Sequence, residues 1–288
     1  MLGFLQNWMP VSASQHGPAL DEMNALVHWL MFGLFVGWSV YFLYVLFRFR
    51  AGANPRASYT GSTSHVSKYI EIGVAVVEVV LLAFFAIPAW ATWVDPPVDP
   101  DNSFTVRVVA QQFAWNIHYA GPDGVFGATE LALITPTNAI GLDRSDPYAV
   151  DDVVKINQMQ LPVDRDITLL LSSMDVIHGF SLPQMRVKQD IIPGLLIPVH
   201  FKPIVVTPQE SRFPACNADR TCWEIACAQL CGLSHYRMRG FYSVMEADEF
   251  DAWMAAEVAA VMPEQPAAEE ADAAAAEGDV QPGDDGGH

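Results

Sequence analysis

Side chains that bind soft metal ions gather in the C-terminal half of this chain of 288 residues. The stretch CAQLCGLSHYRM holds Cys227, Cys231, His235 and Met238, and His178 lies upstream, shortly after the apolar run ITLLLSS. One thiolate, two imidazoles and one thioether form a mononuclear blue-copper site. The second thiolate makes this set too large for one copper ion but suits two copper ions that share both sulfur atoms. The sequence therefore predicts a binuclear copper centre.

Two sulfur-bridged copper ions spread one unpaired electron over both metals, so their ligands move little when an electron arrives. This property suits an electron relay. Two alternatives stay open on the residues alone. Cys227 and Cys231 could form a disulfide outside the cytoplasm. The cluster could also hold structural zinc, although Met is a poor zinc ligand and a second cysteine pair at zinc spacing is missing.

The segment that carries these residues reads as a β domain. From residue 103 to residue 258 the chain has short alternating or β-branched runs separated by turns, such as FTVRVVA, VVKIN and FYSVMEA. Only Asp248–Val261 reads as a short helix. We therefore expect an antiparallel sandwich or barrel.

Two apolar runs precede the β domain. Residues 25–48 and 70–94 are each long enough to cross the hydrocarbon core of a bilayer as a helix. The segment 49–69 between them carries Arg and Lys but no acidic residue, so the positive-inside rule places it in the cytoplasm. We expect a transmembrane hairpin in a lipid bilayer, with both ends of the chain outside.

The remaining segments are short. We expect residues 1–24 to form an N-terminal exterior segment, with Asp21 or Asn24 as the cap of the first helix. The proline-rich, acidic residues 95–102 read as a linker. Residues 259–288 are rich in Ala, acid, Pro and Gly, which predicts a disordered acidic tail.

The formal net charge of −18 excludes nucleic acid as a partner, because phosphate binding needs clustered Lys and Arg. An acidic exterior instead favours a basic protein partner. The chain has no Cys-x-x-Cys-His motif, so we expect no covalent haem on it. Cys216 and Cys222 flank a short loop, and we favour a disulfide between them over free thiols.

The run C-x-x-x-C-G-x-x-H-x-x-M, after two apolar segments and a β domain, resembles the binuclear copper (CuA) centre of cytochrome c oxidase subunit II. The resemblance covers roughly residues 25–255, and its motif is highly specific. It implies a two-helix transmembrane hairpin followed by an all-β cupredoxin-like barrel or sandwich. It implies that the metal ligands are the backbone carbonyl of Gln229 and the side chains of His178, Cys227, Cys231, His235 and Met238.

Two further segments resemble this family. Gln111–Trp115 (QQFAW) is similar to the aromatic segment through which electrons enter, with Phe113 in place of a common Trp, so Phe113 or Trp115 is implied to accept electrons. Lys188–Gly194 (KQDIIPG) is similar to the stretch near the haem propionates of subunit I. The family often has a Glu at the position of Gln229 that binds a magnesium ion shared with subunit I, so this magnesium site stays open here.

The second apolar run contains two carboxylates, Glu71 and Glu78. A carboxylate in a membrane span is costly and indicates a function by default. The two lie about two helical turns apart and so share one face, which we expect to contact subunit I. Counted back from Pro88, Glu71 matches the family's glutamate at the entrance of a proton-uptake channel. The alternatives are an interfacial, hydrated Glu71 and a structural hydrogen bond for Glu78.

The resemblance implies a subunit of a proton-translocating cytochrome c oxidase in the bacterial cytoplasmic membrane, with the copper domain on the periplasmic side. It would accept electrons from cytochrome c and pass them to haem in subunit I, where oxygen is reduced to water. The alternatives are a copper-free quinol-oxidase homologue, a copper storage, assembly or sensor protein, and a nitric-oxide-reducing relative. The intact ligand set argues against the first, and carboxylates within the membrane spans argue against the second.

Overall fold

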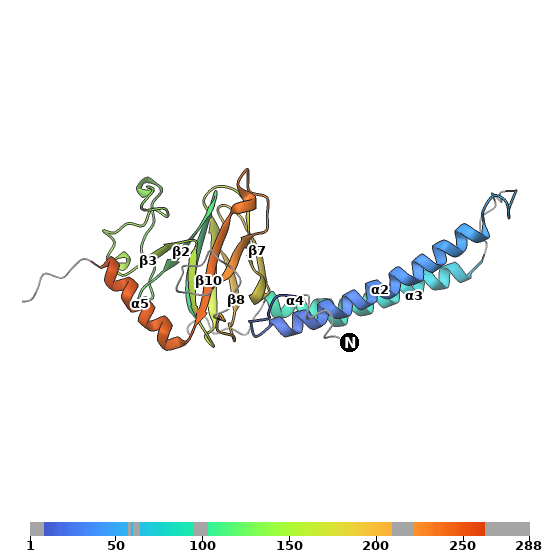
Figure 1. Ribbon diagram of the computed structural model, residues 1–288, viewed down its shortest axis with the longest axis horizontal. Helices are drawn as coiled ribbons and strands as arrows, with labels where there is room; N and C mark the ends of the chain where they lie inside the picture. Colours follow the sequence, from blue (N-terminus) through green and yellow to red (C-terminus); the bar gives the residue numbers. More distant parts are fainter. Residues whose placement is uncertain (1–8, 57–58, 60–63, 95–102, 209–221, 263–288) are drawn as a thin grey trace, which may run out of the picture. The chain divides into compact units, whose positions relative to one another are not determined.

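The structure is a computed structural model that describes residues 9–56, 59, 64–94, 103–208 and 222–262 (Figure 1). The expected linker 95–102, Cys216 and the expected tail beyond residue 262 lie outside these ranges. The chain divides into two compact units, which are residues 1–119 with 154–252 and residues 120–153 with 253–288.

Two apolar helices begin the first unit. Helix α2 spans Gly17–Arg48, and the second apolar run forms α3 (Val66–Leu81), a π-helical turn (Leu82–Ala86) and α4 (Ile87–Val94). Large apolar side chains along both are exposed, and both are long and apolar enough to cross a membrane. The expected pair of membrane-spanning helices is confirmed on these grounds.

The expected start of the first helix at residue 25 is wrong, because α2 begins at Gly17. Pro18 in the first turn explains this start, since its fixed φ and missing N–H suit the beginning of a helix. His16 is the N-cap, so Asp21 lies inside the helix and is buried there. The expected exterior segment 1–24 therefore ends in about two turns of helix.

The second helix also begins earlier than expected, at Val66 rather than at residue 70. The residues before the apolar run are polar but helical, and the hydrophobic pattern alone does not show them. The π-helical turn at Leu82–Ala86 ends just before Pro88. Proline removes one helical hydrogen bond and its ring crowds the preceding turn, so a local widening fits this position.

The β domain is a sandwich of two five-stranded sheets (Figure 1). The first sheet has the order β3-β2-β1-β5-β8, with strands Val153–Ile156, Ala114–Tyr119, Phe104–Gln111, Ile167–Ser173 and Ile197–Phe201. The second has the order β4-β10-β9-β6-β7, with strands Gln158–Pro162, Arg239–Met245, Trp223–Cys227, His178–Leu182 and Val187–Ile191. The expected all-β cupredoxin-like sandwich is confirmed.

The expectation of purely antiparallel sheets is wrong. Strand β1 pairs with β5 in parallel, and β10 pairs with β4 in parallel, while β1–β2, β5–β8, β6–β7, β6–β9 and β9–β10 are antiparallel. A parallel pair needs a long crossover, and the chain between β1 and β5 supplies it by building β2, β3 and β4 on the way. Alternation within single strands does not reveal such long-range partners.

Alternating side chains of the strands fill the space between the sheets. Val106, Val108 and Ala110 of β1 are fully buried, as are Leu169 and Leu171 of β5. This period of two is that of strands with one face in a core. The close packing of such an interior resists displacement, so the strands form a rigid support for the loops at their ends.

Helix α5 (Ala247–Val261) follows β10. The expected short helix at Asp248–Val261 is confirmed, and it begins one residue earlier. Alanine has the highest helix propensity, and Asp248 and Glu249 in the first turn complement the positive end of the helix dipole. These two effects carry the helix into the Ala-rich sequence that otherwise reads as a tail.

Residues 120–153 of the second unit contain two 3-10 turns, Leu131–Leu133 and Pro147–Ala149. The exposed Arg144 bridges this segment, since its Nη1 donates to the carbonyl oxygens of Ala149 (2.6 Å) and Asp152 (3.0 Å). These contacts give an irregular segment a fixed conformation.

Candidate metal centre

Two neighbouring strands bring the sequence-predicted ligands together. His178 is the first residue of β6 and Cys227 is the last residue of β9, and these strands pair with Phe180 opposite Cys227. The loop after β9 then folds over the start of β6, where Ala228 N–H donates to the carbonyl of Gly179 at 2.7 Å. A Cβ atom on Gly179 would lie 2.8 Å from the backbone nitrogen of Gln229, so this close approach requires glycine.

The remaining candidates lie on the same loop. Cys231 follows Cys227 by four residues, His235 opens the 3-10 turn His235–Arg237, and Met238 follows that turn directly before β10. Cys231 and Met238 are almost fully buried. One short loop therefore presents most of the soft side chains to one another.

The two cysteine sulfur atoms lie at the middle of this cluster. Their Sγ atoms are 3.7 Å apart, and both thiols are free. The Sγ atom of Cys231 lies 3.6 Å from His235 Nδ1 and 3.6 Å from Met238 Sδ, and Cys227 Sγ lies 3.2 Å from the carbonyl oxygen of Gln229. The structure therefore brings these expected ligands together, and it does not form the alternative disulfide between Cys227 and Cys231.

His178 completes the cluster. Its ligand atom and the sulfur atoms of Cys227 and Cys231 all lie within 4.8 Å of one another. Its Nε2 atom is 2.8 Å from Asp175 Oδ1, while its buried Nδ1 atom has no hydrogen-bond partner among the described residues. A carboxylate that binds one ring nitrogen orients the other for a metal. The orphaned Nδ1 atom and the soft donor set fit copper, whereas magnesium and calcium prefer oxygen ligands.

The two thiols have very different acidities. Burial raises the pKa of Cys227, but the neighbouring imidazole of His178 and hydrogen bonds with the backbone of Gly179 and Gln229 outweigh it and lower this pKa to about 6. Burial and the adjacent Cys227 sulfur raise the pKa of Cys231 to about 11. The protein alone therefore stabilises one negative charge at this pair, and full ionisation needs the positive charge of metal ions.

Asp175 connects the cluster to the turn between β1 and β2, a link that the sequence does not reveal. Its Oδ2 accepts a hydrogen bond from the backbone N–H of Gln112 at 2.7 Å. The Gln112 side chain in turn donates from Nε2 to the carbonyl oxygen of Cys231 at 2.6 Å. Burial opposes ionisation of Asp175, but bonds from His178, Gln112 and Val176 outweigh it and lower the pKa of this carboxyl group.

The expected electron-accepting aromatic residues take different positions. Trp115 is fully buried, with its ring 6.1 Å from that of His178 and 5.3 Å from that of Phe180. Phe113 is half-buried and packs against the loop between β9 and β10 (the ligand loop), where a Cβ atom on Gly232 would lie 3.2 Å from the Phe113 ring. A docked protein can therefore touch Phe113 but not Trp115.

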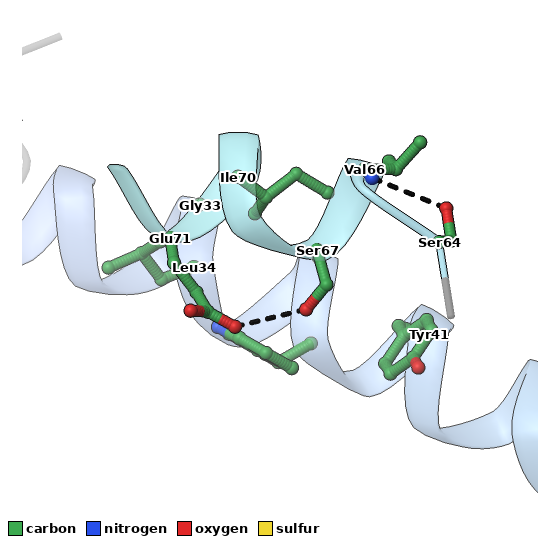
Figure 2. Close-up of a pocket in the computed structure, with 10 residues that line it drawn as sticks. Gly33, Leu34, Tyr41, Ser64, Val66, Ser67, Ile70 and Glu71 are labelled. Carbon is green, nitrogen blue, oxygen red and sulfur yellow. Dashed lines mark hydrogen bonds between the residues drawn. The ribbon is translucent and has the colours of Figure 1, made fainter. Parts of the chain in front are cut away.

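Glu71 belongs to a separate site in the helical hairpin. Helices α2 and α3 line a pocket of about 730 Å³ that includes Gly33, Gly37, Tyr41 and Glu71 (Figure 2). Ser67 Oγ donates to Glu71 Oε1 at 3.0 Å. Glu78 lies farther along α3 and does not line this pocket. Both carboxylates lie on the continuous helix α3, and only Glu71 of the two lines the pocket.

Cys222 is disulfide-bonded. Its expected partner Cys216 lies outside the described residues, so this pairing stays a prediction. Among the described cysteines, Cys227 and Cys231 are free.

Fold and site together define a membrane-anchored, cupredoxin-like protein with a cluster of soft metal ligands. A family model described as "Cytochrome C oxidase subunit II, periplasmic domain" matches residues 104–241. The β domain thus matches the cytochrome c oxidase subunit II family, and the chain is similar along most of its length to subunits 2 of cytochrome c oxidases. It is thus a membrane protein with an exterior domain.

Individual relatives carry the same description. The alternative cytochrome c oxidase subunit 2 of Bradyrhizobium diazoefficiens is 29% identical over 249 residues, which cover 86% of this chain and 82% of that protein. Cytochrome c oxidase subunit 2 of Synechocystis is 26% identical over 277 residues, covering 86% and 75%. The solved periplasmic domain of subunit II from Bradyrhizobium japonicum is 24% identical with a TM-score of 0.38, covering 57% of this chain and 99% of that one.

Proposed function

We propose that this chain accepts electrons one at a time from a c-type cytochrome at a binuclear copper centre. It passes them to haem in subunit I, where oxygen is reduced to water. The observation that carries this proposal is the convergence of two imidazoles, a thioether and a backbone carbonyl on two free cysteine sulfur atoms. A copper-free homologue has no need for this set.

In this proposal Cys227 and Cys231 would supply the thiolates shared by the two copper ions, and His178, His235, Met238 and the Gln229 carbonyl would supply the other ligands. The copper pair, when bound, takes up and releases one electron. Burial of Cys231 and Met238 keeps water from the sulfur atoms. Strand ends and short loop bonds hold the ligands in place, so they rearrange little between oxidation states.

Metal analysis and electron paramagnetic resonance of the purified membrane complex test this function. We expect two copper ions per chain and a spectrum of one electron shared by both. One copper ion per chain, or a spectrum localised on one ion, contradicts the proposal. Oxygen consumption and haem content of the same sample distinguish an oxygen-reducing complex from a nitric-oxide-reducing one.

Metal analysis of the same complex also tests whether a magnesium ion is bound. Gln229 is exposed and offers a neutral amide instead of the carboxylate that magnesium prefers. We therefore propose that this side chain contributes no charge to any magnesium ion shared with subunit I.

We propose that electrons enter through Phe113, since it is the half-exposed aromatic residue of the segment and contacts the ligand loop at Gly232. In this proposal the buried Trp115 has a structural role, since its ring packs against that of His178 in the core. The exposed Leu230, Leu233 and Tyr236 of the same loop extend the apolar surface around this point.

We place the chain in the bacterial cytoplasmic membrane with the copper domain on the periplasmic side. The basic, acid-free segment 49–69 supports this orientation, because such segments stay in the cytoplasm. The family description of residues 104–241 as a periplasmic domain agrees with it.

The acidic exterior predicts a salt-dependent reaction with a basic cytochrome c. The net charge is −18, and electrostatic steering raises association rates but is screened by salt. We expect the second-order rate of turnover to fall by about tenfold or more from low to high ionic strength. A chain truncated after Met262 measures the share of the acidic C-terminal residues. A rate that is flat with ionic strength contradicts the prediction.

Glu71 predicts a defect in proton uptake. We expect Glu71→Gln to slow oxygen turnover by about tenfold, with normal electron transfer into copper. This is less than the roughly 10²–10⁴-fold typical of acid–base groups, because water can partly replace an entrance group. Glu78→Gln makes the same change about 10 Å along the helix, outside the pocket of Figure 2. Stopped-flow haem reduction with a pH indicator measures both variants. Unchanged turnover in both variants would show that Glu71 and Glu78 have structural roles and take no part in proton uptake.

A further inference from the structure

Arg186 ties the turn between β6 and β7 to the head of membrane helix α2. Its Nε atom lies 2.7 Å from Asp21 Oδ1, and its Nη2 atom lies 2.8 Å from Asp21 Oδ2. Both side chains are only 9% exposed. Two parallel bonds between a guanidinium and a carboxylate fix distance and orientation together, so this pair defines how the helix head meets the turn.

The other donors of Arg186 reach the segment just before α2. Nη2 donates to the carbonyl of Pro10 at 2.7 Å, and Nη1 makes a longer contact to the carbonyl of Val11 at 3.4 Å. Nη1 also donates to Pro183 within its own turn at 2.6 Å. The guanidinium has five N–H donors, and the bonds to Asp21 and to these carbonyls use its three nitrogen atoms fully.

Backbone bonds hold the same segment to the sandwich. Ala13 N–H donates to the carbonyl of Gln184 at 2.8 Å, and Gln15 N–H donates to that of Lys202 at 2.9 Å. Ser14 is fully buried, and its Oγ donates to the carbonyl of Met185 at 2.8 Å. The residues that lead into α2 are thus part of the sandwich edge. We name this set of contacts, with the Arg186–Asp21 pair, the helix clamp.

The backbone conformation of Arg186 indicates that the arginine side chain has a function at this position. It adopts φ 55° and ψ 30°, the left-handed region. A residue with a Cβ atom is disfavoured there, whereas glycine adopts this conformation readily. A backbone outlier of this kind points to a function that outweighs its cost. The contacts of the Arg186 side chain in the helix clamp supply such a function.

The clamp lies on the strand pair that carries the metal centre. Strand β6 begins at His178 and runs directly into the clamped turn, and β7 leads out of it toward Lys188–Gly194. We propose that Arg186 is a positioning residue for electron transfer, which fixes the copper-binding sandwich to the first membrane helix and so fixes its register against subunit I. This inference rests on the proposed electron-transfer function.

The test uses the purified oxidase complex with Arg186→Gly, Asp21→Asn and, as a matched control, Arg165→Gly. Arg165 lies in another β turn of the sandwich, is exposed, and stacks on Phe104 at 4.9 Å. Glycine at position 186 suits the left-handed backbone, so this variant removes the clamp without straining the turn. Arg186→Lys keeps the charge but not the paired bonds, and it serves if the glycine variant does not assemble.

We expect Arg186→Gly and Asp21→Asn to keep the copper content and spectrum of the unmodified complex. The amide protons of Ala13 and Gln15 should exchange about tenfold faster or more, and electron transfer from reduced copper to haem should slow about tenfold. Arg186→Lys should fall between, and Arg165→Gly should change neither rate. Faster amide exchange with an unchanged electron-transfer rate overturns the positioning role, and unchanged amide exchange overturns the clamp itself. Absence of copper from the unmodified complex overturns the proposed function instead, while the amide measurement still reports on the clamp.

Discussion

Cys227→Ser should remove the binuclear copper signal from the complex completely. The Cys227 and Cys231 sulfur atoms lie 3.7 Å apart at the middle of the ligand cluster, and the proposed centre needs both as bridges. A serine hydroxyl is a hard, neutral oxygen donor, whereas copper in such sites selects thiolates. We expect at most one copper ion per chain, no shared-electron spectrum and loss of electron transfer to haem. Metal analysis and electron paramagnetic resonance of the same sample measure this.

Cys222→Ser is the matched control for this substitution. Cys222 is also nearly buried and lies just before β9, but it is disulfide-bonded and stands outside the group of metal-binding side chains. Loss of a disulfide in a secreted domain costs about 2–5 kcal/mol of unfolding free energy. We therefore expect a lower melting temperature with an unchanged copper spectrum. A binuclear spectrum that survives in Cys227→Ser excludes the bridged centre.

The metal centre is largely predictable from sequence because its ligands are local. Four of its side chains fall between Cys227 and Met238, so their spacing alone indicates a common site. His178 is distant in sequence, but it follows an apolar run and so stands at a strand end. In the structure this run is β5 of the first sheet, whereas His178 opens β6 of the second sheet, which pairs with the strand that ends at Cys227.

The supports of the centre are not predictable in the same way. Asp175 and Gln112 are 63 residues apart, and each belongs to a different turn. Their contact depends on the parallel pairing of β1 with β5, which no alternation within one strand reveals. The burial of Trp115 cannot be predicted from the sequence for the same reason. Which face of β2 is buried depends on the strands and the second sheet that pack against it.

The helix ends differ from the sequence prediction for another reason. A hydrophobic run locates the part of a helix that lies in lipid, whereas the helix itself continues wherever polar residues find partners. Asp21 has such a partner in Arg186, 165 residues away. Pro18 favours the start of α2 at Gly17, and the clamp gives Asp21 a partner outside the helix, so Asp21 does not cap it.

Asp175→Asn should weaken copper binding by about 10–100-fold, the usual effect of losing a carboxylate that supports a metal-bound imidazole. Asp175 Oδ1 accepts from His178 Nε2 and Oδ2 accepts from the backbone N–H of Gln112. An asparagine side chain has only one acceptor oxygen, so one of these donors faces an amide N–H group and loses its partner. The loss of the negative charge also destabilises the more positive, oxidised metal pair. The reduction potential should therefore rise.

Chelator competition and a redox titration of the complex separate these two effects from simple unfolding. Gln112→Ala keeps the carboxylate and its bond to His178 but removes the bond from Gln112 Nε2 to the Cys231 carbonyl. We expect it to leave the potential nearly unchanged and to weaken copper binding less. Asp143→Asn is the matched control, because this aspartate also accepts bonds within a turn, from Ser145, but touches no histidine. If Asp175→Asn binds copper with unchanged affinity and potential, Asp175 does not orient His178. The unpaired Nδ1 atom of His178 is then not explained as a copper ligand.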